Sequence, residues 1–260
     1  MHAFRLTAIL FLSLFFVQCG VREYKSTSKP VNHAIWDSLL QKHVSDDGWV
    51  DYIGFREDSS ELNKYLDLLS NNHPNKKFWS DDEQLAYWIN AYNAFTVKLV
   101  ADNYPVKSIK DIKDGIPFVN TVWDIKFIHI EGATYDLNNI EHGIIRKQFK
   151  EPRIHFAVNC ASVSCPPLLN HAFTAEKLDQ QLDSVARGFI NGNKRNQLDA
   201  QNPKLSKIFS WFSGDFEKVS DSVRDFINQY ADIQIEEGAD LEYLEYYWEL
   251  NEASNKSILD

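Results

Sequence analysis

The sequence predicts an α+β fold: a helix-rich single domain with a small, mostly antiparallel sheet. Segments with apolar residues at helical spacing outnumber segments in which apolar and polar residues alternate. Strands and helices do not alternate along the chain, which disfavours a doubly wound parallel sheet. No internal repeat or long linker divides residues 33–251, so we expect one globular domain there, followed by a C-terminal tail over 252–260.

Six segments are expected to be helical because their apolar residues recur every three or four positions: 33–44, the residues after Ser60, 81–101, 137–149, 174–189 and 220–230. The third is the best defined. Ser80 and Glu83 form a capping box in front of an apolar run from Asp81 to Ala101. Asp136 is expected to cap the fourth helix, and Pro152 ends it.

Four shorter segments are expected to be extended: 49–55, 123–130, 153–159 and 241–248. In the third, Ile154, Phe156 and Val158 would share an apolar face with Cys160, and His155 would lie on the opposite face. Cys160 would then stand at the carboxyl end of a strand, where loops commonly build functional sites.

Composition excludes some classes of partner. The 260 residues carry a net charge of −10, which argues against nucleic acid, since phosphates are bound by clustered Lys and Arg. It also argues against docking on anionic lipids through charge alone. Aromatic residues make up 13% of the chain and include seven Trp, so we expect an aromatic-rich core or groove.

The N-terminus, residues 1–18, has the features of a signal peptide. Arg5 precedes an uncharged run from Leu6 to Val17, which is too short to span a bilayer but fits a signal-peptide core. The run leads to Phe-Val-Gln-Cys, which resembles the site at which bacterial lipoproteins are cleaved and lipidated. We therefore expect export, lipidation of Cys19, and a polar tether over 19–32 that anchors the domain in the cell envelope, facing the periplasm or the cell surface. The alternative is ordinary signal cleavage without a lipid anchor.

Five ordered segments carry a family resemblance. They are Leu85-Ala-Tyr-Trp-Ile-Asn-Ala-Tyr-Asn-Ala94, Leu137-Asn-Asn-Ile-Glu-His-Gly-Ile-Ile-Arg146, Arg153-Ile-His-Phe-Ala-Val-Asn-Cys-Ala-Ser-Val-Ser-Cys-Pro-Pro-Leu168, Leu205-Ser-Lys-Ile-Phe-Ser-Trp-Phe with Asp215-Phe216, and Tyr247-Trp-Glu-Leu-Asn251. The chain resembles the family known as domain of unknown function 547 over nearly all of residues 33–251. The resemblance implies no activity, because the family has no settled one, so a site has to be argued from the residues.

The predicted domain contains two cysteines, Cys160 and Cys165, and three interpretations of them remain open. Outside the cytosol they can form a disulfide. One of them, preferably Cys160, can be a nucleophile activated by a nearby base. Both can also be small buried residues. Free thiols are slightly favoured, because a disulfide would close a very short loop next to Pro166 and Pro167.

His142 is the predicted base. His142, Arg146 and Asn138 lie four residues apart on one stripe of the expected helix, which suits a base with an anion-binding neighbour. A surface histidine with no catalytic role is the alternative. His155, Arg146 and Cys165 are predicted to contribute to binding. The spacing of the cysteines and histidines is not that of a zinc module, so we expect neither a metal nor a cofactor.

Asn90 and Asn93 stand out because they lie inside the very apolar third helix, where buried amides need hydrogen-bond partners. They are predicted to orient the base or to stabilise an oxyanion. The alternative is that they tie this helix to neighbouring loops.

Two functional hypotheses follow. The first is a thiol-dependent hydrolase or acyltransferase that acts on peptides or other amides, with Cys160 as nucleophile, His142 as base, and Asn93 or Asn90 in support. The second is a non-catalytic envelope module that binds a peptide, glycan or protein in an aromatic groove and carries a structural disulfide between residues 160 and 165.

Overall fold

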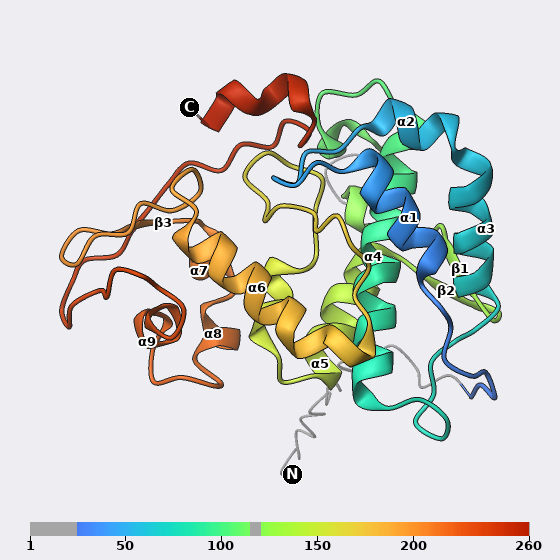
Figure 1. Cartoon of the computed structure of the whole chain (residues 1–260), viewed down its shortest axis with the longest axis horizontal. Coiled ribbons are helices and arrows are strands. Elements are labelled where there is room, and N and C mark those ends of the chain that lie inside the picture. Colours follow the sequence, from blue (N-terminus) through green and yellow to red (C-terminus); the bar gives the residue numbers. More distant parts are fainter. Residues whose placement is uncertain (1–24, 115–120, 260) are drawn as a thin grey trace, which may run out of the picture.

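The computed structural model describes residues 25–114 and 121–259. The predicted signal peptide and Cys19 lie outside these residues, as does the first part of the predicted tether. Within them, no helix combines the length and apolar character that crossing a membrane requires. Figure 1 shows two groups of elements, one over residues 34–103 and 128–135 and the other over residues 204–243, with the helix over residues 178–191 running between them.

The first group is built around α4, which is buried along nearly its whole length. Its helices are α1 (Ala34–His43), α2 (Tyr52–Glu57), α3 (Ser59–Ser70) and α4 (Asp81–Asn103). The capping box at the start of α4 is confirmed, because Ser80 accepts from the N–H of Glu83 and Glu83 accepts from the N–H of Ser80. The short strands β1 (Ile128–Ile130) and β2 (Ala133–Tyr135) form an antiparallel hairpin that packs on α3.

A helical segment over 137–148 follows the hairpin and contains a π-helical stretch, Asn139–Ile145, which continues into α5 (Arg146–Gln148). The side chain of Asp136 accepts from the N–H of Asn139 at 2.5 Å, so the predicted cap is present. A π stretch inserts an extra residue into the turn and is often found at functional sites.

The second group contains α7 (Ile208–Trp211), α8 (Ser213–Phe216), α9 (Val223–Asn228), and the two-residue strands β3 (Lys204–Leu205) and β4 (Glu242–Tyr243), which pair in parallel. The helix α6 (Leu178–Asn191) contributes buried residues to both groups. The predicted tail forms a 3₁₀ helix, Ala253–Leu259. The predicted helix-rich α+β class is confirmed, although the strands form two separate pairs rather than one sheet.

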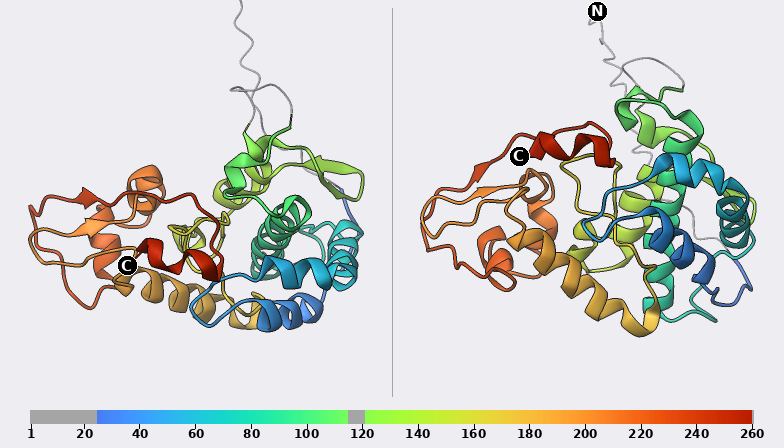
Figure 2. Two further views of the ribbon diagram at one scale, coloured as in Figure 1. Left: turned by 90° about the horizontal axis from the view of Figure 1, so that it is seen from above. Right: turned by 45° about the horizontal axis from the view of Figure 1, so that its top comes forward.

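Two hydrophobic clusters make up the interior, and the segment after Pro152 lies between them. Ile154 and Val158 belong to the cluster of the first group. Phe156 belongs to the other cluster, with aromatic side chains of α6–α9, and Cys160 packs against that cluster. In both views of Figure 2 the yellow segment around residues 155–170 runs between the two groups.

The predicted strand over 153–159 is wrong, since Pro152–Phe156 is a 3₁₀ helix. Proline in its first turn favours a helical start. The alternation of apolar residues has another cause, because Ile154 and Phe156 are buried in different clusters on opposite sides of the segment.

Three other predicted strands are mostly wrong. Within 49–55 the chain turns into α2 after Asp51, which caps that helix by accepting from the N–H of Gly54. In 123–130 only β1 is a strand, and in 241–248 only β4 is.

Candidate active site

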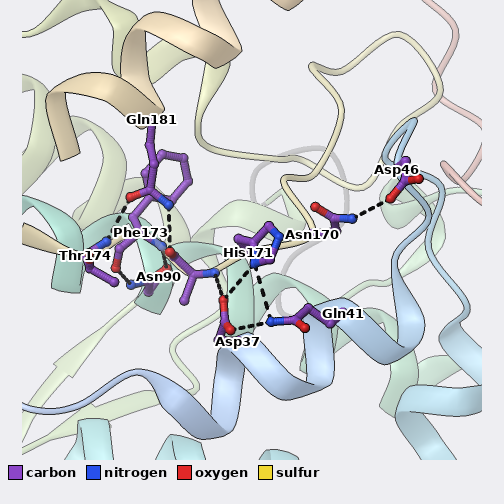
Figure 3. Close-up of polar contacts among 10 residues, drawn as sticks. Asp37, Gln41, Asp46, Asn90, Asn170, His171, Phe173, Thr174 and Gln181 are labelled. Atoms are coloured by element: carbon purple, nitrogen blue, oxygen red, sulfur yellow. Dashed lines mark hydrogen bonds and ion pairs between the residues drawn. The ribbon is translucent and has the colours of Figure 1, made fainter. Parts of the chain in front are cut away.

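A cavity of about 750 Å³ lies between α1, the first turns of α4 and the start of α6. Figure 3 shows polar contacts among some of its lining residues and their neighbours. Asp37 accepts from the N–H of Ala172 (2.9 Å) and lies 3.2 Å from Nδ1 of His171. Gln181 accepts from the N–H of Thr174 (3.0 Å) and donates to the carbonyl of Ala172 (2.8 Å). These groups bind one another and hold residues 171–174 in place, so their role is structural.

A smaller cavity, of about 220 Å³, brings together four of the predicted site residues: His142, His155, Cys160 and Cys165. Most of its remaining lining is aromatic and comes from Tyr92, Trp123, Trp211, Phe212, Tyr246 and Trp248. We call this space the thiol cavity. A small, largely apolar cavity with a few convergent polar groups is typical of a ligand or active site.

Hydrogen bonds from α4 fix the backbone that leads to Cys160. Asn93 donates to the carbonyl of Ala157 (2.9 Å) and accepts from the N–H of Asn159 (2.8 Å). The side chain of Asn159 in turn accepts from the N–H of Ala161 (2.8 Å). Ala161 has a φ of 60°, which is unusual for a residue with a side chain. The strained turn directly after Cys160 is therefore held by its surroundings.

Both cysteines are free thiols, and their sulfur atoms lie 2.9 Å apart. Cys160 Sγ also lies 3.3 Å from the hydroxyl of Tyr246 and 3.4 Å from that of Ser162. The Ser162 hydroxyl donates to Tyr246 (3.3 Å), which leaves the phenolic hydrogen available to the sulfur of Cys160.

These contacts favour ionisation of one sulfur over the other. The hydrogen bond from Cys165 lowers the pKa of Cys160, and the Ser162 and Tyr246 hydroxyls lower it further, although burial opposes them. Burial raises the pKa of Cys165 well above its usual range, and the neighbouring Cys160 raises it more. Cys160 is therefore the sulfur that ionises, while Cys165 keeps its proton.

His155 is buried and lines the same cavity as this pair. Its Nε2 lies 2.9 Å from Oδ2 of Asp215, and its ring stacks on Phe212 with ring centroids 4.0 Å apart. Burial lowers the pKa of His155, and the Asp215 hydrogen bond only partly opposes this, so the ring is neutral at neutral pH. The single ring hydrogen is then on Nε2, where the carboxylate accepts it. Nδ1 carries a lone pair and has no hydrogen-bond partner, although it is buried.

Asp215 is ionised. Burial raises its pKa, but hydrogen bonds from His155, Arg146 and Lys218 outweigh burial and hold the pKa well below its usual range. Arg146 Nε lies 2.5 Å from Oδ2 of Asp215, and Lys218 Nζ lies 2.8 Å from Oδ1. The carboxylate can therefore orient His155 without taking its proton.

His142, the predicted base, is placed less favourably. Its Nδ1 accepts from Arg146 Nη1 at 2.9 Å, so the predicted neighbourhood of these two side chains is present. The His142 side chain is 44% exposed, however, and Arg146 is shared with Asp215. The third member of the predicted stripe, Asn138, donates to Asp124 (2.7 Å).

The two buried amides of α4 lie outside the lining of the thiol cavity. Asn90 donates to the carbonyl of Phe173 (2.7 Å) and accepts from its N–H (3.0 Å), a pair drawn in Figure 3. Asn93 binds the backbone on either side of Val158. Both amides tie α4 to neighbouring loops, which is the structural alternative considered above.

Sequence reasoning assigned no role to Asp215 or Tyr246. Asp215 is a buried acid within the apolar stretch Trp211–Phe216, a signal that could have singled it out. The distance of 60 positions between His155 and Asp215 hides their pairing. No local pattern places Tyr246 beside Cys160.

Over residues 25–114 and 121–259, no group of three or more His, Cys, Asp or Glu side chains is arranged to hold a metal ion.

Comparison with known proteins identifies the family. A model of the family described as "Protein of unknown function, DUF547" matches residues 76–190, which include α4, the π-helical stretch, His155 and both free cysteines. No curated protein and no solved structure matches the chain significantly. The chain therefore contains a DUF547 domain over residues 76–190.

Proposed function

We propose that this domain is a thiol-dependent hydrolase or acyltransferase that acts on peptide or other amide substrates. One observation carries the proposal: His155 lines the cavity that holds Cys160, and its neutral ring gives the Nε2 hydrogen to Asp215 and keeps a buried Nδ1 without a partner. A thiol, an imidazole and an orienting carboxylate are the three groups that covalent acyl transfer requires. The base is His155 rather than His142.

In the first step, Cys160 Sγ attacks the carbonyl carbon of the amide and forms the C–S bond. The thiol proton passes to Nδ1 of His155, and the resulting imidazolium is stabilised by Asp215. The C–N bond then breaks, and Nδ1 returns the proton to the leaving amine. Nδ1 and Sγ are not in hydrogen-bond contact in the free protein, so the transfer needs a bridging water or a small movement when substrate binds.

In the second step, the thioester is cleaved. Nδ1 of His155 removes a proton from a water molecule or from an acceptor amine, which attacks the thioester carbonyl. The C–S bond breaks, and the sulfur leaves as a thiolate that accepts hydrogen bonds from Cys165 and Tyr246. The proton on Nδ1 then returns to the sulfur, and the free enzyme is restored.

Acylation by p-nitrophenyl acetate tests the proposal. The wild-type protein should release p-nitrophenol with turnover, and Cys160→Ser should not. His155→Asn should accumulate the acetyl adduct on Cys160, seen by mass spectrometry, because cleavage of the thioester needs the base. His142→Asn is the matched control and should turn over like the wild type.

Two results would contradict the proposal. One is an acetyl adduct that His155→Asn hydrolyses as fast as the wild type. The other is a quantitative disulfide between residues 160 and 165 in the native, unreduced protein, which would favour the non-catalytic binding module.

We also propose that the protein is exported and anchored in the cell envelope through lipidated Cys19. The support is the uncharged run from Leu6 to Val17 in front of Cys19 and Gly20. The wild-type protein should fractionate with membranes, and Cys19→Ser should appear in a soluble or an uncleaved form. A full-length wild-type protein in the cytosol would contradict this proposal.

A further inference from the structure

We propose that Glu141, together with the aromatic wall of the thiol cavity, binds a primary ammonium group, so that the amide substrate carries a side chain like that of lysine. The role of this group in the reaction rests on the function proposed above, while its binding does not require catalysis. The proposal assigns a specificity site to the thiol cavity.

Glu141 is a buried carboxylate whose lack of a cationic partner is unusual. The residue is 8% exposed and lines the thiol cavity. Of the basic side chains that the structure describes, the one within ion-pair distance is His142, whose Nδ1 lies 3.9 Å from Oε1 of Glu141. That nitrogen accepts a hydrogen bond from Arg146 and has no proton to offer the carboxylate. Burying a charge without a cationic partner is costly, so an ammonium group of a ligand would interact favourably with this carboxylate.

Arg146 does not fill this role, because it is bound to Asp215 and His142. Tyr92, from α4, also lines the cavity. Burial and then the charge of Glu141 raise the pKa of Tyr92 well above its usual range. Tyr92 also donates a hydrogen bond to Glu141, so it satisfies one acceptor position of the carboxylate but supplies no positive charge.

The aromatic part of the cavity lining is suited to a cation. Trp211, Tyr246 and Trp248 form a continuous cluster, with ring centroids 4.7 Å apart for Trp211–Tyr246 and 4.8 Å apart for Tyr246–Trp248. Aromatic faces attract ammonium groups through their electron-rich centres. The Lys110 ammonium already lies 4.5 Å from the ring centre of Trp248, so a ring of this wall accepts such a group.

A cation at Glu141 would also assist the thiol. The hydrogen bond from Cys165 lowers the pKa of Cys160, whereas burial and the negative charge of Glu141 raise it. The negative charge of Glu141 also raises the pKa of His155, against the larger lowering effect of burial. An ammonium bound between Glu141 and the tryptophans would cancel the repulsion between the carboxylate and the Cys160 thiolate. A substrate with this group would thus promote ionisation of its own nucleophile.

Binding is tested with n-butylammonium chloride, which has the end of a lysine side chain, and with n-butanol as the neutral control. The readout is the indole N–H resonances of the protein at neutral pH and constant ionic strength. Saturable shifts are expected with the ammonium and not with the alcohol. Glu141→Gln should weaken the apparent affinity at least tenfold, and the exposed Glu217→Gln should leave it unchanged.

Equal responses to ammonium and alcohol, or equal affinities for the Glu141 and Glu217 variants, would overturn the proposal. The same titration on Cys160→Ser separates it from the proposed function, because amine binding should survive there. In the active protein, the p-nitrophenyl ester of Nα-acetyl-lysine should acylate Cys160 at least tenfold faster than that of Nα-acetyl-norleucine, and Glu141→Gln should remove the difference. A preference that persists in Glu141→Gln would also overturn the proposal.

Discussion

Asp215→Asn is the perturbation with the clearest structural expectation. Asn has the shape of Asp but no charge, and one of its two oxygens becomes an NH₂ group. In the wild type, Oδ2 accepts hydrogen bonds from His155 and Arg146, and Oδ1 accepts one from Lys218. The variant can keep an acceptor towards the first two donors only by turning its NH₂ towards the ammonium of Lys218.

The magnitude follows from the burial of each donor. The His155 side chain is 1% exposed, and a hydrogen bond from such a group to a carboxylate contributes about 1.5–3 kcal/mol. Arg146 is 27% exposed and keeps part of its contact. Lys218 is 62% exposed, so its ion pair contributes about 0–1 kcal/mol. We expect Asp215→Asn to lower the free energy of unfolding by about 2–4 kcal/mol.

The assay is equilibrium unfolding in urea at pH 7, with the free energy obtained by linear extrapolation. Lys218→Met is the control and should lose less than about 1 kcal/mol. If Asp215→Asn lowers the free energy of unfolding no more than Lys218→Met does, the carboxylate is not the centre of this hydrogen-bond network. The reasoning about the orientation of His155 would then fail as well.

Three further predictions concern other parts of the fold. Burial lowers the pKa of His33 to about 4, against a weaker raising effect of Glu176. The folded protein therefore binds this proton less readily than the unfolded chain, so the free energy of unfolding is highest above pH 6.5 and decreases as the pH falls towards 4. The loss is about 3 kcal/mol, and His33→Gln should remove it from the pH dependence of urea unfolding; an unchanged dependence would contradict this. Asn93→Ala leaves two buried backbone groups without partners, so it should lower the free energy of urea unfolding by about 2–4 kcal/mol. A decrease below about 1 kcal/mol would refute the role of Asn93. Ser80→Ala removes one half of the capping box and should lower the stability by about 1 kcal/mol in the same assay, unless the cap contributes nothing.

The sequence was sufficient where the physical signal is local. The capping box of α4 spans four residues, and the hydrogen bonds it predicts are within those residues. The spacing of apolar residues likewise predicted a helix-rich α+β fold, because amphipathic helices bury one face whatever they pack against. Residue types alone also pointed to Cys160, His142 and His155, all of which line one cavity.

Only the tertiary structure could decide the secondary structure of residues 153–159. Apolar residues at every second position indicate a strand when they all face one core and the residues between them face solvent. Here alternate residues face two different cores, with Ile154 in one and Phe156 in the other, and the backbone is 3₁₀ helical. The apolar residue types indicate that these side chains are buried, but they do not indicate which cluster each side chain packs against.

The choice between the two histidines was also beyond the sequence. His142 and His155 are equivalent as residue types, and what separates them is the partner of each ring nitrogen. Nδ1 of His142 is occupied by Arg146, four positions along the same helical segment. Nε2 of His155 is bound by Asp215, 60 positions away, and its Nδ1 remains unpartnered. The chemistry of a histidine depends on which nitrogen carries the hydrogen, and contacts between distant segments decide that only after folding.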